Sequence, residues 1–199
     1  MLAIVVPFRG ADAKRRVAVP APVRARIALA MLGDVVTAGV VAAPTVVVTA
    51  DPEAAALARE LGADVCPDAG GGQGPAVQAA LAEMPESPVL VVNADLPCVV
   101  PHDLRTLAGT AELGALGLVE AHDGTTNALA LPTPAAFAPL YGPGSAARFR
   151  ARAEELGLDA VALALPNLAQ DVDRLADLDA LAVRAGPRTQ AALASLHAA

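Results

Sequence analysis

Short, almost uninterrupted apolar runs rich in valine alternate along this chain with helical patterns and with loops of glycine, proline and aspartate. The clearest runs cover residues 2–8, 45–49 and 89–92. They have the length of strands, and their continuous apolar character indicates burial on both faces, which is typical of parallel sheets covered by helices. The sequence therefore predicts an α/β fold, a three-layer sandwich with a mostly parallel sheet.

The segments between these runs carry the signals of helices. Asp51 followed by Pro52 is a suitable start, and Gly62 a suitable end, for one of them. We expect one domain over residues 1–186 and a loosely attached C-terminal tail over residues 187–199. The expected helices cover residues 23–41, 52–61, 75–84, 101–113, 145–156 and 175–184, and further strands are expected over residues 63–66, 116–121, 128–131 and 160–165.

The composition argues against a nucleic-acid partner. The formal net charge is −7 and aromatic residues make up only 2% of the chain, so the sequence lacks both a basic field and the rings on which bases stack. A phosphorylated substrate would have to be held by local cations, backbone amides or metal ions.

Two features bear on the compartment. Cys66 and Cys98 stand far apart without a CxxC pattern and are expected to be free thiols, as in a reducing cytoplasm. Residues 27–50 are very apolar, but Asp34, two glycines and a proline interrupt them, so a buried helix and strand are favoured over a membrane span. No leader is apparent, and we expect a cytoplasmic protein without a membrane partner.

The loop after the first strand carries four cations within residues 9–16. In open α/β sheets ligands bind at the carboxyl ends of the strands, so the loops after residues 8, 66 and 92 should share one rim. A glycine-containing loop with Lys14 and Arg16 is a suitable seat for a triphosphate. The loop lacks the Walker spacing, and a solvated basic surface is the alternative.

Three further loops combine glycine with polar groups, over residues 70–74, 124–127 and 142–145. Glycines in the first would let a base or ribose approach the backbone closely. The second offers hydroxyls and an amide, and Ser145 is a suitable N-cap for a helix whose free amides would suit a carboxylate or phosphate. Each loop is also explained as a simple turn or a capped helix.

Acidic residues stand at two places where they could meet. Asp95 follows a buried strand closely, in a position suited to holding a divalent cation. Asp171 and Asp173 are two residues apart, so in an extended segment both point to the same side. Three carboxylates would suit Mg²⁺ bound together with phosphate oxygens, while caps of a turn and a helix are the alternative.

The succession of the basic loop, the glycine cluster and the motifs NADLP, GTTN, GPGS and DVD resembles the guanylyltransferases of deazaflavin coenzyme (coenzyme F-420) biosynthesis. The resemblance spans residues 5–181, and NADLP also occurs in molybdopterin nucleotidyltransferases. It implies a single-domain nucleotidyltransferase of the GT-A-like, Rossmann-like type that uses Mg²⁺. The family acts on 2-phospho-L-lactate or phosphoenolpyruvate.

The resemblance also implies roles for single residues. Lys14 and Asp95 would be catalytic, and the metal would be held by Asp95, Asp171 and Asp173. The nucleotide would be bound by Pro7, Lys14, Arg16, Gly72, Gly74 and Asn93. The phosphorylated acid would be bound by Thr126, Gly142 and Ser145.

The chain departs from the family pattern at three positions. Arg15 stands where serine is common, Ala76 lies near the place of a usual asparagine, and Phe149 replaces a common histidine. The last two departures bear on base reading and acid binding, but they leave the metal site untouched.

The activity implied by the resemblance is transfer of GMP from GTP to phosphoenolpyruvate by direct displacement, giving enolpyruvoyl-2-diphospho-5′-guanosine and pyrophosphate. The product would pass to a downstream transferase of coenzyme biosynthesis. 2-Phospho-L-lactate is the alternative acceptor, and a molybdopterin or sugar-phosphate nucleotidyltransferase is the alternative enzyme. Outside catalysis, the alternatives are an inactive nucleotide-binding regulatory module and a plain α/β domain.

Overall fold

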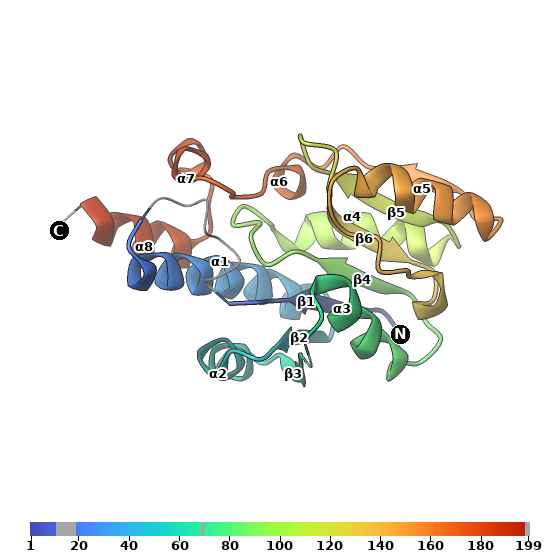
Figure 1. The fold of residues 1–199 in the computed structure, drawn as a ribbon, viewed down its shortest axis with the longest axis horizontal. Helices are drawn as coiled ribbons and strands as arrows, with labels where there is room; N and C mark the ends of the chain where they lie inside the picture. Colours follow the sequence, from blue (N-terminus) through green and yellow to red (C-terminus); the bar gives the residue numbers. More distant parts are fainter. Residues whose placement is uncertain (11–18, 69, 198–199) are drawn as a thin grey trace.

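The computed structural model describes residues 1–10, 19–68 and 70–197, and Figure 1 shows their fold. The strands are β1 (Ala3–Pro7), β2 (Thr45–Thr49), β3 (Asp64–Pro67), β4 (Val89–Val92), β5 (Leu116–Glu120), β6 (Thr126–Leu131) and β7 (Ala160–Ala162). They form one sheet in the order β3-β2-β1-β4-β6-β5-β7. β6 is antiparallel to both of its neighbours, and the other strand pairs are parallel, as the sequence predicts.

The helices of the described residues follow the predicted order with two additions, α6 and α8. Their bounds are α1 (Ala21–Ala42), α2 (Pro52–Glu60), α3 (Gln73–Ala82), α4 (Pro101–Glu112), α5 (Ser145–Glu155), α6 (Pro166–Ala169), α7 (Leu175–Leu181) and α8 (Pro187–His197). The predicted cap of α2 is confirmed, because Asp51 Oδ1 accepts hydrogen bonds from the backbone N–H groups of Glu53 (2.9 Å) and Ala54 (3.2 Å).

Helices cover both faces of the sheet. Successive residues of a strand point to opposite faces, so β1 contributes to two separate cores. Ile4 and Val6 pack with apolar residues of α1, α2 and α4, such as Leu32. Val5 packs on the other face with residues of α3 and α5, such as Phe149. The prediction of a three-layer sandwich is confirmed.

α1 is long and apolar enough to cross a membrane by length and composition alone. However, 56% of its apolar window is buried inside the protein, and it packs against α2, α4 and α8. A buried core helix has the same composition as a membrane span because both are surrounded by apolar groups. The prediction that residues 27–50 divide into a buried helix and a buried strand is confirmed by α1 and β2.

The hairpin of β5 and β6 differs from the prediction at one end. The sequence predicts a strand from residue 128, with Thr126 and Asn127 in the preceding turn. The structure begins β6 at Thr126, and the side chains of both residues are buried. Buried polar residues are tolerated at the start of this strand because each has a specific hydrogen-bond partner near the candidate site, described below.

The residues after Gly186 are not a loose tail as expected, because they form α8, which packs along α1. Asp34, in the middle of α1, is only 6% exposed. Its two carboxylate oxygens accept hydrogen bonds from the backbone N–H groups of Arg188 (3.1 Å) and Thr189 (2.9 Å). These N–H groups belong to the first turn of α8, so a carboxylate of one helix caps another. The division of the chain at Gly186 stays a prediction.

We expect Asp34→Ala to lower the free energy of unfolding by about 1–2 kcal/mol, the usual cost of losing an N-cap. Two buried amide donors of α8 would lose their acceptor, so α8 should also exchange its amide hydrogens faster than the sheet. Urea denaturation and hydrogen exchange measure these effects. Asp64→Ala, at an exposed carboxylate of β3, is the control and should stay close to the parent protein. An equal loss in both variants would contradict the capping role.

Candidate nucleotide and metal site

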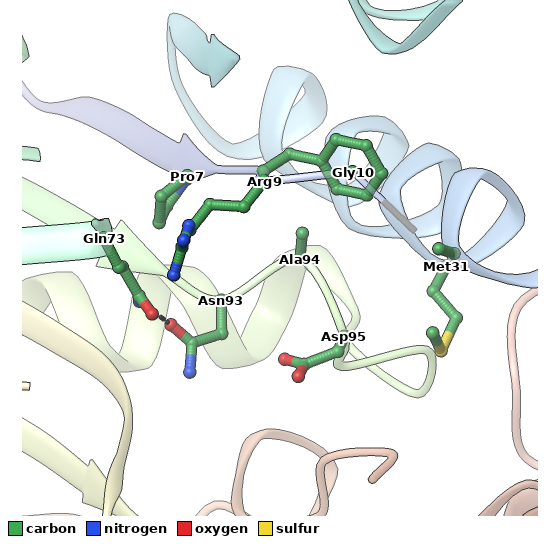
Figure 2. A pocket seen from close by; sticks show the side chains of 10 residues that line it. Pro7, Arg9, Gly10, Met31, Gln73, Asn93, Ala94 and Asp95 are labelled. Atoms are coloured by element: carbon green, nitrogen blue, oxygen red, sulfur yellow. Dashed lines mark hydrogen bonds between the residues drawn. The ribbon is translucent and has the colours of Figure 1, made fainter. Parts of the chain in front are cut away.

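A cavity of about 270 Å³ opens at the rim where β1 and β4 end and α3 begins (Figure 2). The prediction that the loops after the first, third and fourth strands share one rim is confirmed, because residues that follow β1 and β4 line the cavity together with Gln73, the first residue of the helix after β3. The cavity is lined by Pro7, Phe8, Arg9, Gly10, Ala28, Met31, Gln73, Asn93, Ala94 and Asp95. Pro7, Asn93 and Asp95, predicted site residues, therefore lie together.

Three polar side chains shape this cavity. Arg9 extends from the end of β1 into it, toward Asn93 (Figure 2). Gln73 Nε2 donates to Asn93 Oδ1 (2.7 Å), and Asn93 Nδ2 donates in turn to the carbonyl oxygen of Thr126 (3.2 Å). From the sequence, Arg9 counts only as one cation of the basic loop, and nothing singles out Gln73. The amide chain that reveals Gln73 joins three elements, so no local motif shows it.

Three carboxylates meet beside the cavity. Asp95, Asp171 and Asp173 each offer an oxygen, and these oxygens lie within 4.8 Å of one another. The two segments are joined by a hydrogen bond from the Val172 N–H to the Asp95 carbonyl oxygen (3.1 Å). The Val172 side chain is fully buried, so both flanking carboxylates turn away from the core to the same side, as the spacing predicts.

Asn127 fixes the second segment from β6. Its Nδ2 group donates to the carbonyl oxygen of Leu168 (3.0 Å) and to Asp171 Oδ1 (3.3 Å). Burial raises the pKa of the Asp171 carboxyl above its ordinary value and the Asp95 carboxylate raises it further, while the hydrogen bond from Asn127 lowers it. Folding therefore brings negative charges together where burial and mutual repulsion disfavour the ionised form of Asp171. From the sequence, Asn127 is only the amide of a polar turn, and no contact with Asp171 is predicted.

The acidic cluster fits a divalent cation. Carboxylate oxygens are the ligands that Mg²⁺ and Mn²⁺ prefer, and the three side chains offer theirs within 4.8 Å of one another. Nearby negative charge is also what a cation would neutralise. A site of this kind holds a metal by a few carboxylates and leaves the remaining positions for water or phosphate oxygens.

A second cavity of about 300 Å³ also borders the cluster. Asp171 and Asp173 line this cavity, whereas Asp95 lines the first one. Its other lining residues are His122, Asp123, Gln170, Asp177, Ala180 and Leu181. The cluster therefore stands between two spaces, an arrangement suited to joining two substrates at one metal.

The structure brings Thr126 and Ser145 together but changes the role of Ser145. Its hydroxyl donates to Thr126 Oγ1 (3.1 Å), and both residues are buried. Gly144 is the N-cap of α5, and no side chain caps this helix, so the prediction that Ser145 is the cap is wrong. The buried hydroxyl of Thr126 is a closer partner than the first amides of the helix. Gly142, with φ of 110°, lies in the same loop.

The remaining predicted residues divide into two groups. Gly72 is the N-cap of α3 with φ of 107°, a backbone conformation that favours glycine. Gly74 allows close packing, since a Cβ there would lie 2.6 Å from the Cβ of Pro139. Lys14 and Arg16 lie outside the described residues, so their predicted contacts with the nucleotide phosphates stay predictions.

The fold is similar to those of solved nucleotide-handling transferases. A nucleotidyl transferase from Methanothermobacter thermautotroptrophicus matches with a TM-score of 0.64 at 16% identity, covering 98% of this chain and 99% of that one. A candidate nucleotide-diphospho-sugar transferase from Desulfovibrio desulfuricans matches with a TM-score of 0.78 at 15% identity, covering 99% and 95%. These identities concern the fold alone. They show that this chain has the α/β fold of these transferases.

The family follows from the sequence. A family model described as "Guanylyl transferase CofC like" matches residues 2–195, and the chain belongs to this family. A phosphoenolpyruvate guanylyltransferase of Streptomyces scabiei is 40% identical over 211 residues, covering 97% of this chain and 96% of the relative. One of Thermomonospora curvata is 39% identical over 208 residues, covering 98% and 90%. The resemblance inferred from the order of the motifs is confirmed, and the chain is a nucleotidyltransferase.

We expect Asp171→Asn to stabilise the metal-free protein at neutral pH. The raised pKa means that the folded state binds a proton at Asp171 more tightly than the unfolded chain, so the ionised group destabilises the fold above that pKa. The substitution removes this charge, and its carboxamide oxygen still accepts from Asn127. The gain in the midpoint of thermal unfolding should shrink as the pH falls through the pKa of Asp171, because the parent side chain then becomes neutral too.

The same substitution should remove the stabilisation by Mg²⁺. For the parent protein this amounts to about 2.7 kcal/mol when free Mg²⁺ is 100 times its dissociation constant. Thermal unfolding with and without Mg²⁺ measures both effects, and Asp179→Asn, at an exposed position of α7, is the control. A variant that Mg²⁺ stabilises as much as the parent protein would show that Asp171 is not a ligand.

Proposed function

We propose that the protein is a phosphoenolpyruvate guanylyltransferase of coenzyme F-420 biosynthesis. It transfers GMP from GTP to phosphoenolpyruvate and gives enolpyruvoyl-2-diphospho-5′-guanosine and pyrophosphate. The observation that carries this proposal is the cluster of Asp95, Asp171 and Asp173 between two cavities. It stands in a chain about 40% identical, over nearly its whole length, to proteins named for this reaction.

GTP occupies the first cavity in this proposal. Pro7, Asn93, Gly72 and Gly74 bind the nucleoside, and the triphosphate lies against the basic loop. Lys14 and Arg16 neutralise the phosphates, joined by Arg9, whose side chain extends into the cavity. A structural relative, CMP:2-keto-3-deoxy-manno-octonic acid synthetase, was solved with CTP (TM-score 0.60, 12% identity) and supports nucleotide binding by this fold.

Thr126, Gly142 and Ser145 bind the acceptor in this proposal. Its phosphate oxygen attacks the α-phosphorus of GTP, the bond to the bridging oxygen breaks, and pyrophosphate leaves with the electron pair. The chain has little covalent work to do: it must align two polyanions and exclude competing geometries. Lys14 balances the charge that develops on the leaving pyrophosphate.

Asp95, Asp171 and Asp173 would hold Mg²⁺, which supplies charge neutralisation at the reacting phosphates. A glucosyl-3-phosphoglycerate synthase from Mycobacterium tuberculosis was solved with Mn²⁺, UDP and phosphoglyceric acid, and it shares this fold with a TM-score of 0.55 at 15% identity. That complex supports the joint binding of a metal, a nucleotide and a small phosphorylated acid by this architecture. The three assembled carboxylates also favour an enzyme over an inactive nucleotide-binding module.

The product contains a phosphoric anhydride, which is an activated group, so it serves as substrate for a downstream transferase of the same biosynthesis. The two cysteines are free thiols, which suits work in a reducing cytoplasm.

We expect the purified protein, incubated with GTP, Mg²⁺ and phosphoenolpyruvate, to release pyrophosphate and to form a product with the mass of the guanylylated acid. A parallel incubation with 2-phospho-L-lactate tests the alternative acceptor. Faster turnover of 2-phospho-L-lactate would overturn the acceptor assignment, and no product with either acid would overturn the function.

Asp95→Asn should lower kcat by about 10³-fold or more, because a lost metal ligand removes several kcal/mol of charge stabilisation in the transition state. The fold should survive, which circular dichroism checks. Asp64→Asn carries the same chemical change at an exposed position of β3 and should keep full activity. Full activity of the Asp95 variant would contradict the metal site.

A further inference from the structure

One arginine holds the loop that leads into α5. Arg148 Nε and Nη2 donate to the carbonyl oxygen of Leu140 at 3.1 and 2.7 Å. Nη2 also donates to the carbonyl oxygen of Tyr141 (3.2 Å), and Nη1 to that of Pro143 (2.6 Å). A rigid, planar guanidinium that gathers three carbonyls of one short loop fixes the path of that loop far better than a single contact would.

Gathering these carbonyls has a geometric consequence for the amides. The C=O and N–H of a trans peptide unit point in opposite directions, and the described residues contain no cis peptide bond. The three carbonyls turn toward Arg148, so the N–H groups of Tyr141, Gly142 and Gly144 turn away from it. Gly142 and Gly144 have φ values of 110° and 70°, which favour glycine and let neighbouring amides converge.

The loop adjoins the two hydroxyl residues assigned to the acceptor. The Gly142 carbonyl oxygen accepts from the Ser145 N–H (2.9 Å), and the Ser145 hydroxyl donates to Thr126 Oγ1 (3.1 Å). The first two amides of α5 are occupied within the protein, because the Ala146 N–H also donates to the Gly124 carbonyl oxygen (3.3 Å). The loop amides that turn away from Arg148 are therefore the better donors for an anion than the helix itself.

We propose that Arg148 is a positioning residue for the acceptor: by holding the carbonyls of Leu140, Tyr141 and Pro143, it aims the amides of Gly142 and Gly144 at the anionic groups of the phosphorylated acid. This rests on the proposed function, which places that acid beside Thr126 and Ser145. Arg148 acts through the loop backbone and does not itself touch the reacting atoms.

The neighbouring arginines of α5 provide a contrast. Arg150 pairs with Glu120, and Arg152 Nη1 pairs with Glu155 Oε2 at 3.2 Å. Arg148 instead donates four side-chain hydrogen bonds to main-chain carbonyls. It is exposed, so the three carbonyls would regain water if the guanidinium were lost, and the fold should tolerate its replacement.

The experiment compares Arg148→Gln, Arg148→Lys and the control Arg152→Gln in steady-state transfer from GTP to phosphoenolpyruvate. We expect Arg148→Gln to raise the KM for the acid at least about 10-fold, since misplacement by about 1 Å costs up to 100-fold. The KM for GTP and the melting temperature should stay near the parent values. Arg148→Lys should fail to rescue, because an ammonium is a point charge without the planar fork. Arg152→Gln should match the parent protein.

Two results would overturn the proposal. Rescue by Arg148→Lys would show that charge, not the fixed loop, assists the acid. A rise in both KM values, together with a fall in kcat and in the melting temperature, would show a merely structural role.

Calorimetric binding of phosphoenolpyruvate in the presence of Mg²⁺ separates the proposal from the proposed function. Weaker binding by Arg148→Gln supports the positioning role even if the parent protein transfers no GMP, in which case the proposed function alone fails. Equal binding by the parent protein and Arg148→Gln overturns the positioning role, whether or not transfer occurs. A parent protein that binds no phosphorylated acid overturns both.

Discussion

The hydrogen bond from the Val172 N–H to the Asp95 carbonyl oxygen joins two distant parts of the chain at the point where like charges must meet. Asp171 and Asp173 flank Val172, and their carboxylates repel that of Asp95. This repulsion would drive the two segments apart if nothing held them together. The buried Val172 side chain and the amide of Asn127 add the fixing contacts. These contacts hold the three carboxylates together despite their repulsion. A bound cation would make the same arrangement favourable.

This arrangement explains how an acidic chain can handle polyanions. The net charge of −7 offers no general attraction for phosphates, so binding must depend on local groups. The first cavity provides Arg9 beside Asp95, and the proposed acceptor loop provides the amides of Gly142 and Gly144. Because the cluster borders both cavities, a metal held there would face two substrates at once, which is the geometry that a direct displacement requires.

The features predicted from the sequence depend on residues close together in the chain, whereas the missed features depend on contacts between residues far apart in the chain. Buried strands are recognised from the apolar runs of their own sequence. The rule that parallel strands end at one rim then places Asp95 near other loop residues. The Asp34 cap on α8 and the Ser145–Thr126 hydroxyl pair join residues distant in sequence, so no pattern in either segment shows them. Asn127 looked like a turn residue because its partners at Leu168 and Asp171 were invisible from the hairpin alone.

Three of the four aromatic rings of the chain gather near the loop that leads into α5. Phe137, Tyr141 and Phe149 have ring centroids 5.5–6.1 Å apart, and Phe149 is fully buried. The family resemblance implies a histidine at the position of Phe149, and this chain departs from that pattern. In this chain that position belongs to the core, so it anchors the loop from inside while Arg148 holds it from outside. An anion bound beside Thr126 and Ser145 would therefore find the loop amides in place of a histidine, so the direction of these amides matters for its binding.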